Sequence, residues 1–128
     1  MPLNIRDHHW VAVKVDLQAL ELIVYDCSIG ATSSKEMDAL MLPLQTMIPT
    51  MLRVSSQFED IAQCLHKPRT YTRLLSVPQN SRGDCAVYTI KFIEFDMAGC
   101  TFDRLSDDMI PFYRMKMAVD IFCQDWDL

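Results

Sequence analysis

Two short apolar segments near the N-terminus constrain the fold more than any other part of the sequence. The first, Trp10 to Asp16, alternates Val11, Val13 and Val15 on one face, and the second, Leu20 to Tyr25, is more continuously apolar. Alternating β-branched residues are typical of a β-strand. Only three residues separate the two segments, so the sequence predicts an antiparallel hairpin.

After the hairpin the apolar residues change to helical spacing. Ser33 and Glu36 form a capping-box pattern, which predicts the start of a helix. Apolar residues at helical spacing extend this segment to about Arg53. Pro43 and Pro49 lie within it, and we expect them to kink or divide the helix because proline removes a backbone donor.

The residue pattern in the second half of the chain predicts one more strand and another helix. Residues 55 to 70 have mixed polarity and are interpreted as a loop or short helix. Tyr71 to Val77 resembles a strand, and residues 78 to 83 are rich in turn formers. Helical spacing returns from Asp84, and Gly99 is a suitable residue to follow that helix.

A last helix is predicted near the C-terminus. Ser106 can cap it, Asp107 and Asp108 favour its first turn, and Pro111 lies early enough to be tolerated. The expected order is β-β-α-β-α-α, an α+β class with a small antiparallel sheet packed with helices. No second domain is evident, so residues 1–128 are interpreted as a single domain.

Charge and hydropathy exclude two classes of partner. The 128 residues carry 12 basic and 17 acidic side chains, a formal charge of −5, without a Lys/Arg cluster. We therefore expect no nucleic-acid ligand. No apolar run approaches the roughly 20 residues of a membrane-spanning helix, so we expect no membrane insertion.

The cysteines favour a reducing compartment. They lie 15 to 37 residues apart without a C-x-x-C pair, which fits neither a disulfide framework nor a zinc site. The N-terminal residues lack the apolar segment of a secretion signal. We expect an intracellular protein, and the sequence does not distinguish nucleus from cytoplasm. The five cysteines are Cys27, Cys64, Cys85, Cys100 and Cys123.

The predicted hairpin brings an imidazole and a carboxylate together. His9 lies where the first strand begins, and Asp26 lies where the second strand ends. The start and the end of an antiparallel hairpin share one edge of the sheet, so the two side chains are expected to be neighbours. This pairing is the relation of base and orienting group in a nucleophilic triad.

Cys85 is the candidate nucleophile that could complete this group. It lies in the first turn of a predicted helix, where unpaired backbone N–H groups favour the thiolate. Gly83 lets the backbone bend into the helix, and Gln79 could direct its amide at an oxyanion. Taken singly, each residue also has a structural interpretation: a buried inert thiol, a surface histidine or a turn former.

Three short motifs together resemble one protease family. His9-Trp10 opens a strand, Tyr25-Asp26 ends the next, and Pro78-Gln79 precedes Gly83-Asp84-Cys85-Ala86-Val87-Tyr88 at a helix start. These motifs, in the order His, Asp, Gln, Cys, resemble the ubiquitin-like-protein-specific protease (ULP/SENP) family of cysteine proteases. The C-terminal helical segments are similar to plant members of that family.

The resemblance implies a papain-like α+β fold and a role for each residue. His9 would be the general base, Asp26 its orienting group, Gln79 an oxyanion-hole donor and Cys85 the nucleophile. Trp10 would line the channel that clamps the Gly-Gly tail of the substrate.

The chain departs from the family pattern at two places. Ala86 follows the nucleophile where the family usually has glycine, and eight residues precede His9 where the family has further elements and a second channel tryptophan. We therefore expect an N-terminally truncated catalytic domain, either a fragment of a longer product or a degenerate copy.

The function implied by the resemblance is hydrolysis after the C-terminal Gly-Gly of SUMO or another ubiquitin-like modifier, without metal or organic cofactor. The expected partners are that modifier and its conjugates. Two alternatives stay open: an inactive protease-like module that binds a ubiquitin-like protein or another partner chain, and an acyl-transfer enzyme with another substrate. The sequence determines neither the modifier nor the oligomeric state.

Overall fold

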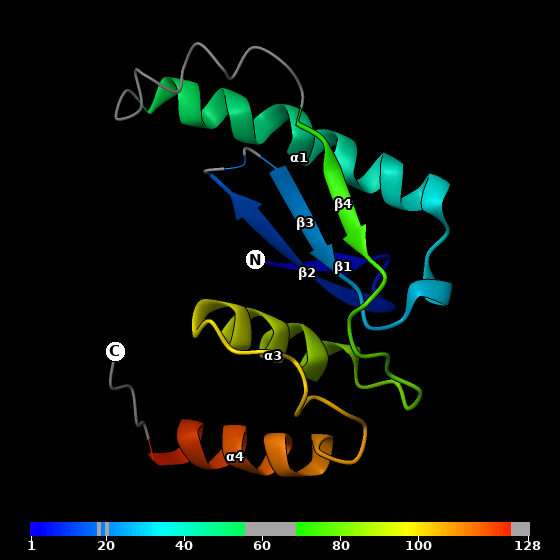
Figure 1. The fold of residues 1–128 in the computed structure, drawn as a ribbon, viewed down its shortest axis with the longest axis vertical. Helices are drawn as coiled ribbons and strands as arrows, with labels where there is room; N and C mark the ends of the chain where they lie inside the picture. Colours follow the sequence, from blue (N-terminus) through cyan, green and yellow to red (C-terminus); the bar gives the residue numbers. More distant parts are fainter. Residues whose placement is uncertain (18, 20, 56–68, 124–128) are drawn as a thin grey trace.

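A four-stranded sheet in the order β1-β2-β3-β4 lies at the centre of the structure (Figure 1). Strands β1 (Pro2–Ile5), β2 (His9–Asp16) and β3 (Glu21–Tyr25) pair antiparallel, and β4 (Tyr71–Leu74) pairs parallel with β3. The computed structural model describes residues 1–17, 19, 21–55 and 69–123.

The predicted hairpin is confirmed. Strands β2 and β3 pair antiparallel, with Val13 opposite Val24 and Asp16 opposite Glu21. The predicted start of the second strand, Leu20, lies outside the described residues, as do positions 56–68 of the segment interpreted as a loop or short helix.

Strand β1 was not expected from the sequence. It is four residues long and carries Pro2 and the polar Asn4, so it lacks the alternation that marks β2. The turn that joins it to β2 has positive φ angles at Arg6 and Asp7. The Asn4 side chain stabilises this turn by accepting a hydrogen bond from the Asp7 N–H at 2.8 Å.

The last strand corrects the prediction of an antiparallel sheet. β4 ends at Leu74 rather than Val77 and runs parallel to β3, with Val24 opposite Arg73. The chain crosses between these strands through helix α1 (Ser34–Val54), and such a crossover returns it to the end at which β3 began. The sheet is therefore mixed.

Helix α1 confirms the capping box but is not divided. Ser33 accepts the Glu36 N–H, and the Glu36 carboxylate accepts the Ser33 N–H. Both prolines lie inside one 21-residue helix. Pro49 cannot donate to the Gln45 carbonyl, but the Arg69 N–H donates to it instead at 3.1 Å.

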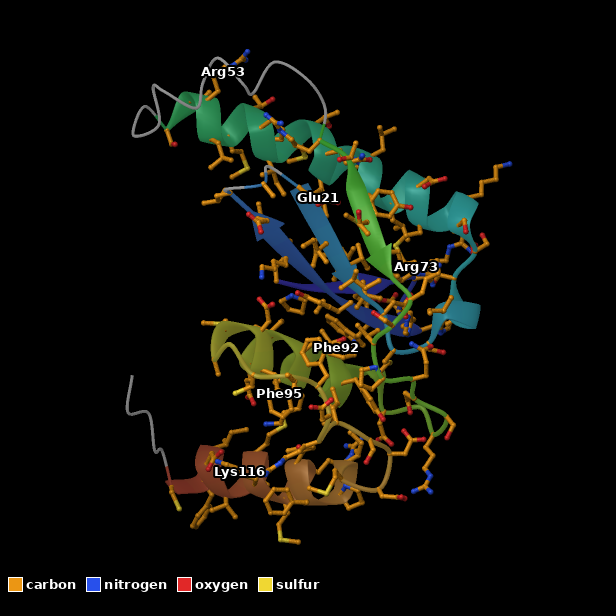
Figure 2. All side chains as sticks on the ribbon, in the orientation of Figure 1. Glu21, Arg53, Arg73, Phe92, Phe95 and Lys116 are labelled. Atoms are coloured by element: carbon orange, nitrogen blue, oxygen red, sulfur yellow. The ribbon has the colours of Figure 1, made fainter. Side chains whose placement is uncertain are left out.

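Each face of the sheet packs against a different helix layer (Figure 1). The α1 face is mainly aliphatic, and α3 (Cys85–Met97) with α4 (Ile110–Cys123) builds an aromatic core on the other face. The side chains of Phe92 and Phe95 point into this second layer (Figure 2). The buried aliphatic set is Ile5, Val11, Val13, Leu22, Val24, Met37 and Met41.

The C-terminal helices agree with the prediction in part. Gly99 follows the C-cap of α3 with φ +65°, as expected. Helix α4 begins at Ile110, later than predicted, because Ser106 starts a separate turn in which its carbonyl accepts the Met109 N–H. Asp107 accepts a hydrogen bond from the Tyr88 hydroxyl.

Among the described residues, no helix is long and apolar enough to span a membrane.

Candidate active site

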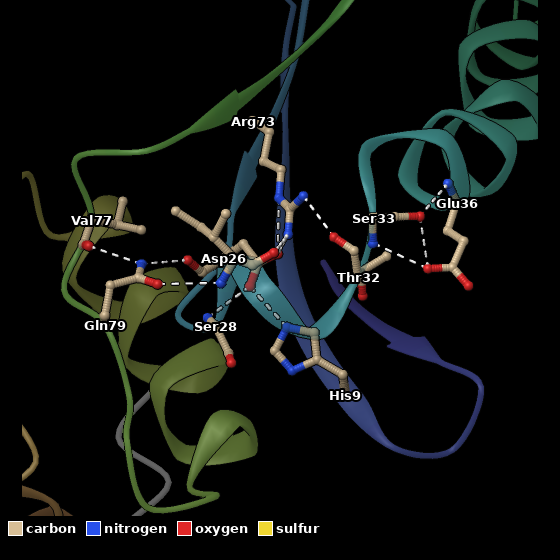
Figure 3. A network of polar contacts seen from close by, with 10 residues as sticks. His9, Asp26, Ser28, Thr32, Ser33, Glu36, Arg73, Val77 and Gln79 are labelled. Carbon is tan, nitrogen blue, oxygen red and sulfur yellow. Dashed lines mark hydrogen bonds and ion pairs between the residues drawn. The ribbon is translucent and has the colours of Figure 1, made fainter.

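His9 and Asp26 meet at one end of the sheet, as the hairpin predicts. His9 Nε2 lies 2.8 Å from Asp26 Oδ1 (Figure 3). His9 is 5% exposed and Asp26 is fully buried. A hydrogen bond in this position is shielded from water, which strengthens its electrostatic part.

The Asp26 carboxylate accepts several further hydrogen bonds. The Ser28 N–H donates to Oδ1 at 2.8 Å, and Arg73 donates to Oδ2 from Nε at 3.0 Å and from Nη2 at 2.5 Å (Figure 3). Burial alone raises the pKa of Asp26, but the bonds from His9, Ser28 and Arg73 outweigh it and hold that pKa below its usual value. Asp26 is therefore ionised near neutral pH.

This carboxylate determines which nitrogen of His9 is available for chemistry. An ionised carboxylate can only accept, so the Nε2 atom of His9 must carry the proton that it shares with Asp26. In the neutral ring Nδ1 then keeps a free lone pair. The pair thus presents an imidazole with one nitrogen anchored and the other able to accept a proton.

Cys85 is the first residue of α3 and is partly buried. It packs against the aromatic core, and the backbone before it bends at Gly83 with φ +79°, as the sequence predicts. Within the described part of the chain its Sγ makes no hydrogen bond, to His9 or to any other residue. The meeting of sulfur and imidazole stays a prediction.

The loop before Cys85 is nevertheless tied to the segment that follows Asp26. The Asn80 N–H donates to the Cys27 carbonyl at 2.6 Å, and Gln79 Oε1 accepts the Ile29 N–H at 3.2 Å. Burial and then the nearby Cys85 raise the pKa of the Cys27 thiol to about 12. The candidate nucleophile therefore begins its helix close to the residue that follows Asp26.

The Gln79 amide faces backbone carbonyls in this conformation. Its Nε2 donates to the Asp26 carbonyl at 2.9 Å and to the Val77 carbonyl at 3.2 Å (Figure 3). To stabilise an oxyanion, Nε2 would have to exchange one of these bonds. The oxyanion role of Gln79 stays a prediction, and its observed effect is to link the loop to the end of β3.

Trp10 follows His9 on β2 and has 37% of its surface exposed. An accessible indole beside the candidate base is compatible with substrate contact, and the channel role stays a prediction. His8, on the other side of His9, is exposed.

Arg73 is the site residue that sequence reasoning missed. It lies in β4 with 11% of its side chain exposed. A signal was available, because an arginine inside a predicted strand needs a carboxylate or carbonyl partner when it is buried. Its partner, however, could not be identified without the strand order.

The part of the chain that the structure describes contains no cluster of metal-binding side chains. No three of the His, Cys, Asp and Glu side chains described there gather closely enough to hold a metal ion.

The chain is similar to solved structures of the SUMO protease Ulp1. The X-ray structure of the C-terminal Ulp1 protease domain in complex with Smt3, the yeast ortholog of SUMO, has a TM-score of 0.52 and 18% identity. The match covers 83% of this chain and 43% of that one. A second structure, SUMO protease Ulp1 with its catalytic cysteine oxidised to a sulfenic acid, has a TM-score of 0.49, 19% identity and coverages of 80% and 42%.

This chain thus spans less than half the length of those solved domains. No curated protein sequence matches it significantly. Residues 1–125, however, match the sequence model of the Ulp1 protease family, C-terminal catalytic domain. With the α+β fold described above, this match shows that the chain belongs to the Ulp1 protease family.

Proposed function

We propose that this protein is a cysteine peptidase that hydrolyses the peptide or isopeptide bond after the C-terminal Gly-Gly of SUMO or another ubiquitin-like modifier. The observation that carries the proposal is the buried hydrogen bond between His9 Nε2 and Asp26 Oδ1, which leaves Nδ1 free to act as a base. Membership in the Ulp1 protease family supports it, and one relative of similar fold was solved in complex with Smt3.

In the proposed acylation step, the Cys85 sulfur attacks the carbonyl carbon of the terminal glycine. The thiol proton passes to His9 Nδ1, and the carbonyl oxygen becomes an oxyanion held by the Cys85 N–H and by Gln79. The imidazolium, stabilised by Asp26, then gives its proton to the leaving amine. The products are a thioester and the released amine.

In the proposed deacylation step, His9 takes a proton from water as the water attacks the thioester carbonyl. The sulfur leaves with the electrons of the C–S bond and takes the proton back from the imidazolium. The free modifier is released with a C-terminal carboxyl group, which ionises to the carboxylate. No redox partner is consumed, and the chemistry requires neither a metal ion nor an organic cofactor.

The partners in this proposal are a ubiquitin-like modifier and its conjugates, with Trp10 as a contact for the narrow Gly-Gly tail. A reducing location, in the nucleus or the cytoplasm, is part of the proposal because the spacing of the five cysteines does not suggest a disulfide framework.

The proposal is tested with SUMO and ubiquitin that carry a C-terminal vinyl sulfone. We expect a covalent adduct at Cys85, identified by mass spectrometry, that is absent in Cys85→Ser and reduced at least tenfold in His9→Ala. Two matched controls are Cys100→Ser, which removes an exposed thiol, and His8→Ala, which removes the exposed neighbour of His9. Both should label like the unmodified protein.

Absence of labelling by either probe on a folded sample would overturn the proposal. Binding of SUMO without labelling, measured by calorimetry, would instead favour the inactive module. Labelling that persists in His9→Ala would show that the thiol reacts without the imidazole, which contradicts the mechanism.

A further inference from the structure

We propose that Arg73 is a positioning residue of the active site, which fixes the Asp26 carboxylate so that Oδ1 is directed at His9 Nε2. This inference rests on the proposed function, because it concerns the reactivity of Cys85 through His9 and Asp26. Arg73 itself contacts neither the imidazole nor, in the proposed mechanism, the substrate.

The first support is the number of bonds that Arg73 makes. Its Nε and Nη2 donate to Asp26 Oδ2 at 3.0 Å and 2.5 Å, Nη1 donates to the Thr32 carbonyl at 3.0 Å, and Nη2 also donates to the Ile29 carbonyl at 2.8 Å (Figure 3). All three nitrogens of the guanidinium are used. The planar group is therefore held in one orientation.

The two oxygens of Asp26 have separate partners. Oδ1 accepts His9 and the Ser28 N–H, whereas Oδ2 accepts Arg73. A free carboxylate rotates readily about the bond to its Cβ. Donors on both oxygens oppose this rotation, so the direction of Oδ1 toward the imidazole is fixed.

The position of Arg73 in the sheet explains how it reaches Asp26. Val24 lies opposite Arg73 in the parallel pair of β3 and β4, and Asp26 lies two residues beyond Val24, directly after the end of β3. The same guanidinium holds the carbonyls of Ile29 and Thr32, at the 3₁₀ turn and just after it. Arg73 thus connects β4, the end of β3 and the segment that leads to α1.

The charge of Arg73 has a second effect on the same carboxylate. Asp26 is fully buried, and burial favours the protonated acid. A protonated Asp26 could donate a hydrogen bond to Nε2 and reverse the tautomer of His9. The adjacent guanidinium opposes this protonation, so Nδ1 remains the nitrogen that accepts the thiol proton.

Lysine cannot reproduce this arrangement. An ammonium keeps the charge but lacks the planar fork that spans Oδ2 and two carbonyls. Arg73→Lys therefore keeps the positive charge but removes the planar set of donors. Arg73→Met removes both the charge and the donors and keeps an unbranched side chain of moderate length. Arg104→Met is the matched control. Arg104 is exposed, and its guanidinium makes no hydrogen bond or ion pair with any residue that the structure describes.

The test uses two readouts on the full chain. The first is cleavage of a fluorogenic SUMO C-terminal substrate, analysed as kcat and KM. The second is the rate at which iodoacetamide alkylates Cys85, followed by mass spectrometry at fixed pH, which needs no modifier. We expect Arg73→Met to lower kcat and the alkylation rate by roughly tenfold to a hundredfold, with KM within about twofold.

A double-mutant cycle separates positioning from a general structural role. If Arg73 acts through Asp26, adding Arg73→Met to Asp26→Asn should change kcat and alkylation by less than about twofold. Arg73→Lys should lie between the unmodified protein and Arg73→Met. If the two losses multiply instead, Arg73 acts independently of Asp26 and the inference is wrong.

The outcomes also distinguish this inference from the proposed function. If the unmodified protein fails to cleave SUMO substrates but Cys85 alkylation falls in the Arg73 variants and not in Arg104→Met, the positioning role stands and the SUMO assignment fails. Unchanged alkylation in a folded Arg73→Met overturns the inference. If Arg73→Met does not fold, the same comparison is made with Arg73→Lys, whose unchanged alkylation and kcat would overturn it.

Discussion

Two carboxylates in this protein each accept hydrogen bonds from two side chains but have different surroundings. Asp26 is fully buried and accepts a histidine and an arginine, whereas Asp96, near the end of α3, accepts the Lys14 ammonium at 3.0 Å and the Tyr25 hydroxyl at 2.8 Å with 25% of its side chain exposed. Both clusters connect to strands β2 and β3. The comparison therefore contrasts a carboxylate that is shielded from water with one that water reaches in part.

Access of water determines how much each cluster contributes to the stability of the fold. Breaking a buried ion pair leaves a desolvated charge without compensation, whereas a partly exposed charge such as that of Asp96 can be rehydrated when it loses its partner. The Asp26 cluster can thus hold an imidazole in one orientation, and the Asp96 cluster mainly links α3 to the sheet. The two clusters thus differ both in burial and in residue choice, since only the Asp26 cluster contains an imidazole.

The largest expected effect is the difference in stability between two alanine variants. Asp26→Ala should lower the free energy of unfolding by about 3 to 5 kcal/mol, because Arg73 loses its buried counter-charge. Asp96→Ala should cost about 1 kcal/mol or less. Urea denaturation measures both, and equal losses would contradict the role assigned to burial.

A smaller effect is expected in the pH dependence of stability. The pKa of Asp26 is lower in the folded state than in the unfolded chain. Its contribution to stability is therefore fully present above the unfolded value, about 3.9 for an ordinary aspartate, and is lost as the pH falls through the lower folded value. Asp26→Asn should unfold with a weaker dependence on acid below about pH 4, with Asp96→Asn as the control variant. Identical acid curves for Asp26→Asn and the unmodified protein would refute this.

The smallest expected effect is the response to salt. The coupling energy between Lys14 and Asp96, measured by a double-mutant cycle, should be about 0.5 kcal/mol at low salt and close to zero in 1 M NaCl. The coupling between His9 and Asp26 should change little, because both side chains are shielded from mobile ions. A salt-sensitive His9–Asp26 coupling would mean that water reaches this end of the sheet.

The sequence predicted those parts of the fold that depend on residues close together in the chain. Alternating valines produced the β2–β3 hairpin, and the pairing of His9 with Asp26 followed from it. The capping box of Ser33 and Glu36 fixed the start of α1. Each of these features depends on residues that are close in the sequence or joined by one tight connection.

The parts that could not be predicted depend on distant segments. The parallel pairing of β4, and with it the bond from Arg73 to Asp26, spans 47 residues and requires knowledge of how α1 crosses the sheet. The continuity of α1 through Pro49 likewise depends on Arg69, which lies beyond the helix. The relation of Cys85 to His9 depends on how α3 docks, which no local pattern specifies.

Assembly of the polar site follows the distances between its residues along the chain. His9 and Asp26 can meet within one hairpin, whereas Arg73 reaches Asp26 only when β4 pairs with β3. Contacts between distant segments form late because closing a long loop costs entropy. A nascent or partly unfolded chain would therefore hold a mobile carboxylate beside its imidazole. A chain in which β4 has not yet paired would therefore lack the fixed carboxylate that the proposed reaction requires, even where its hairpin is already formed.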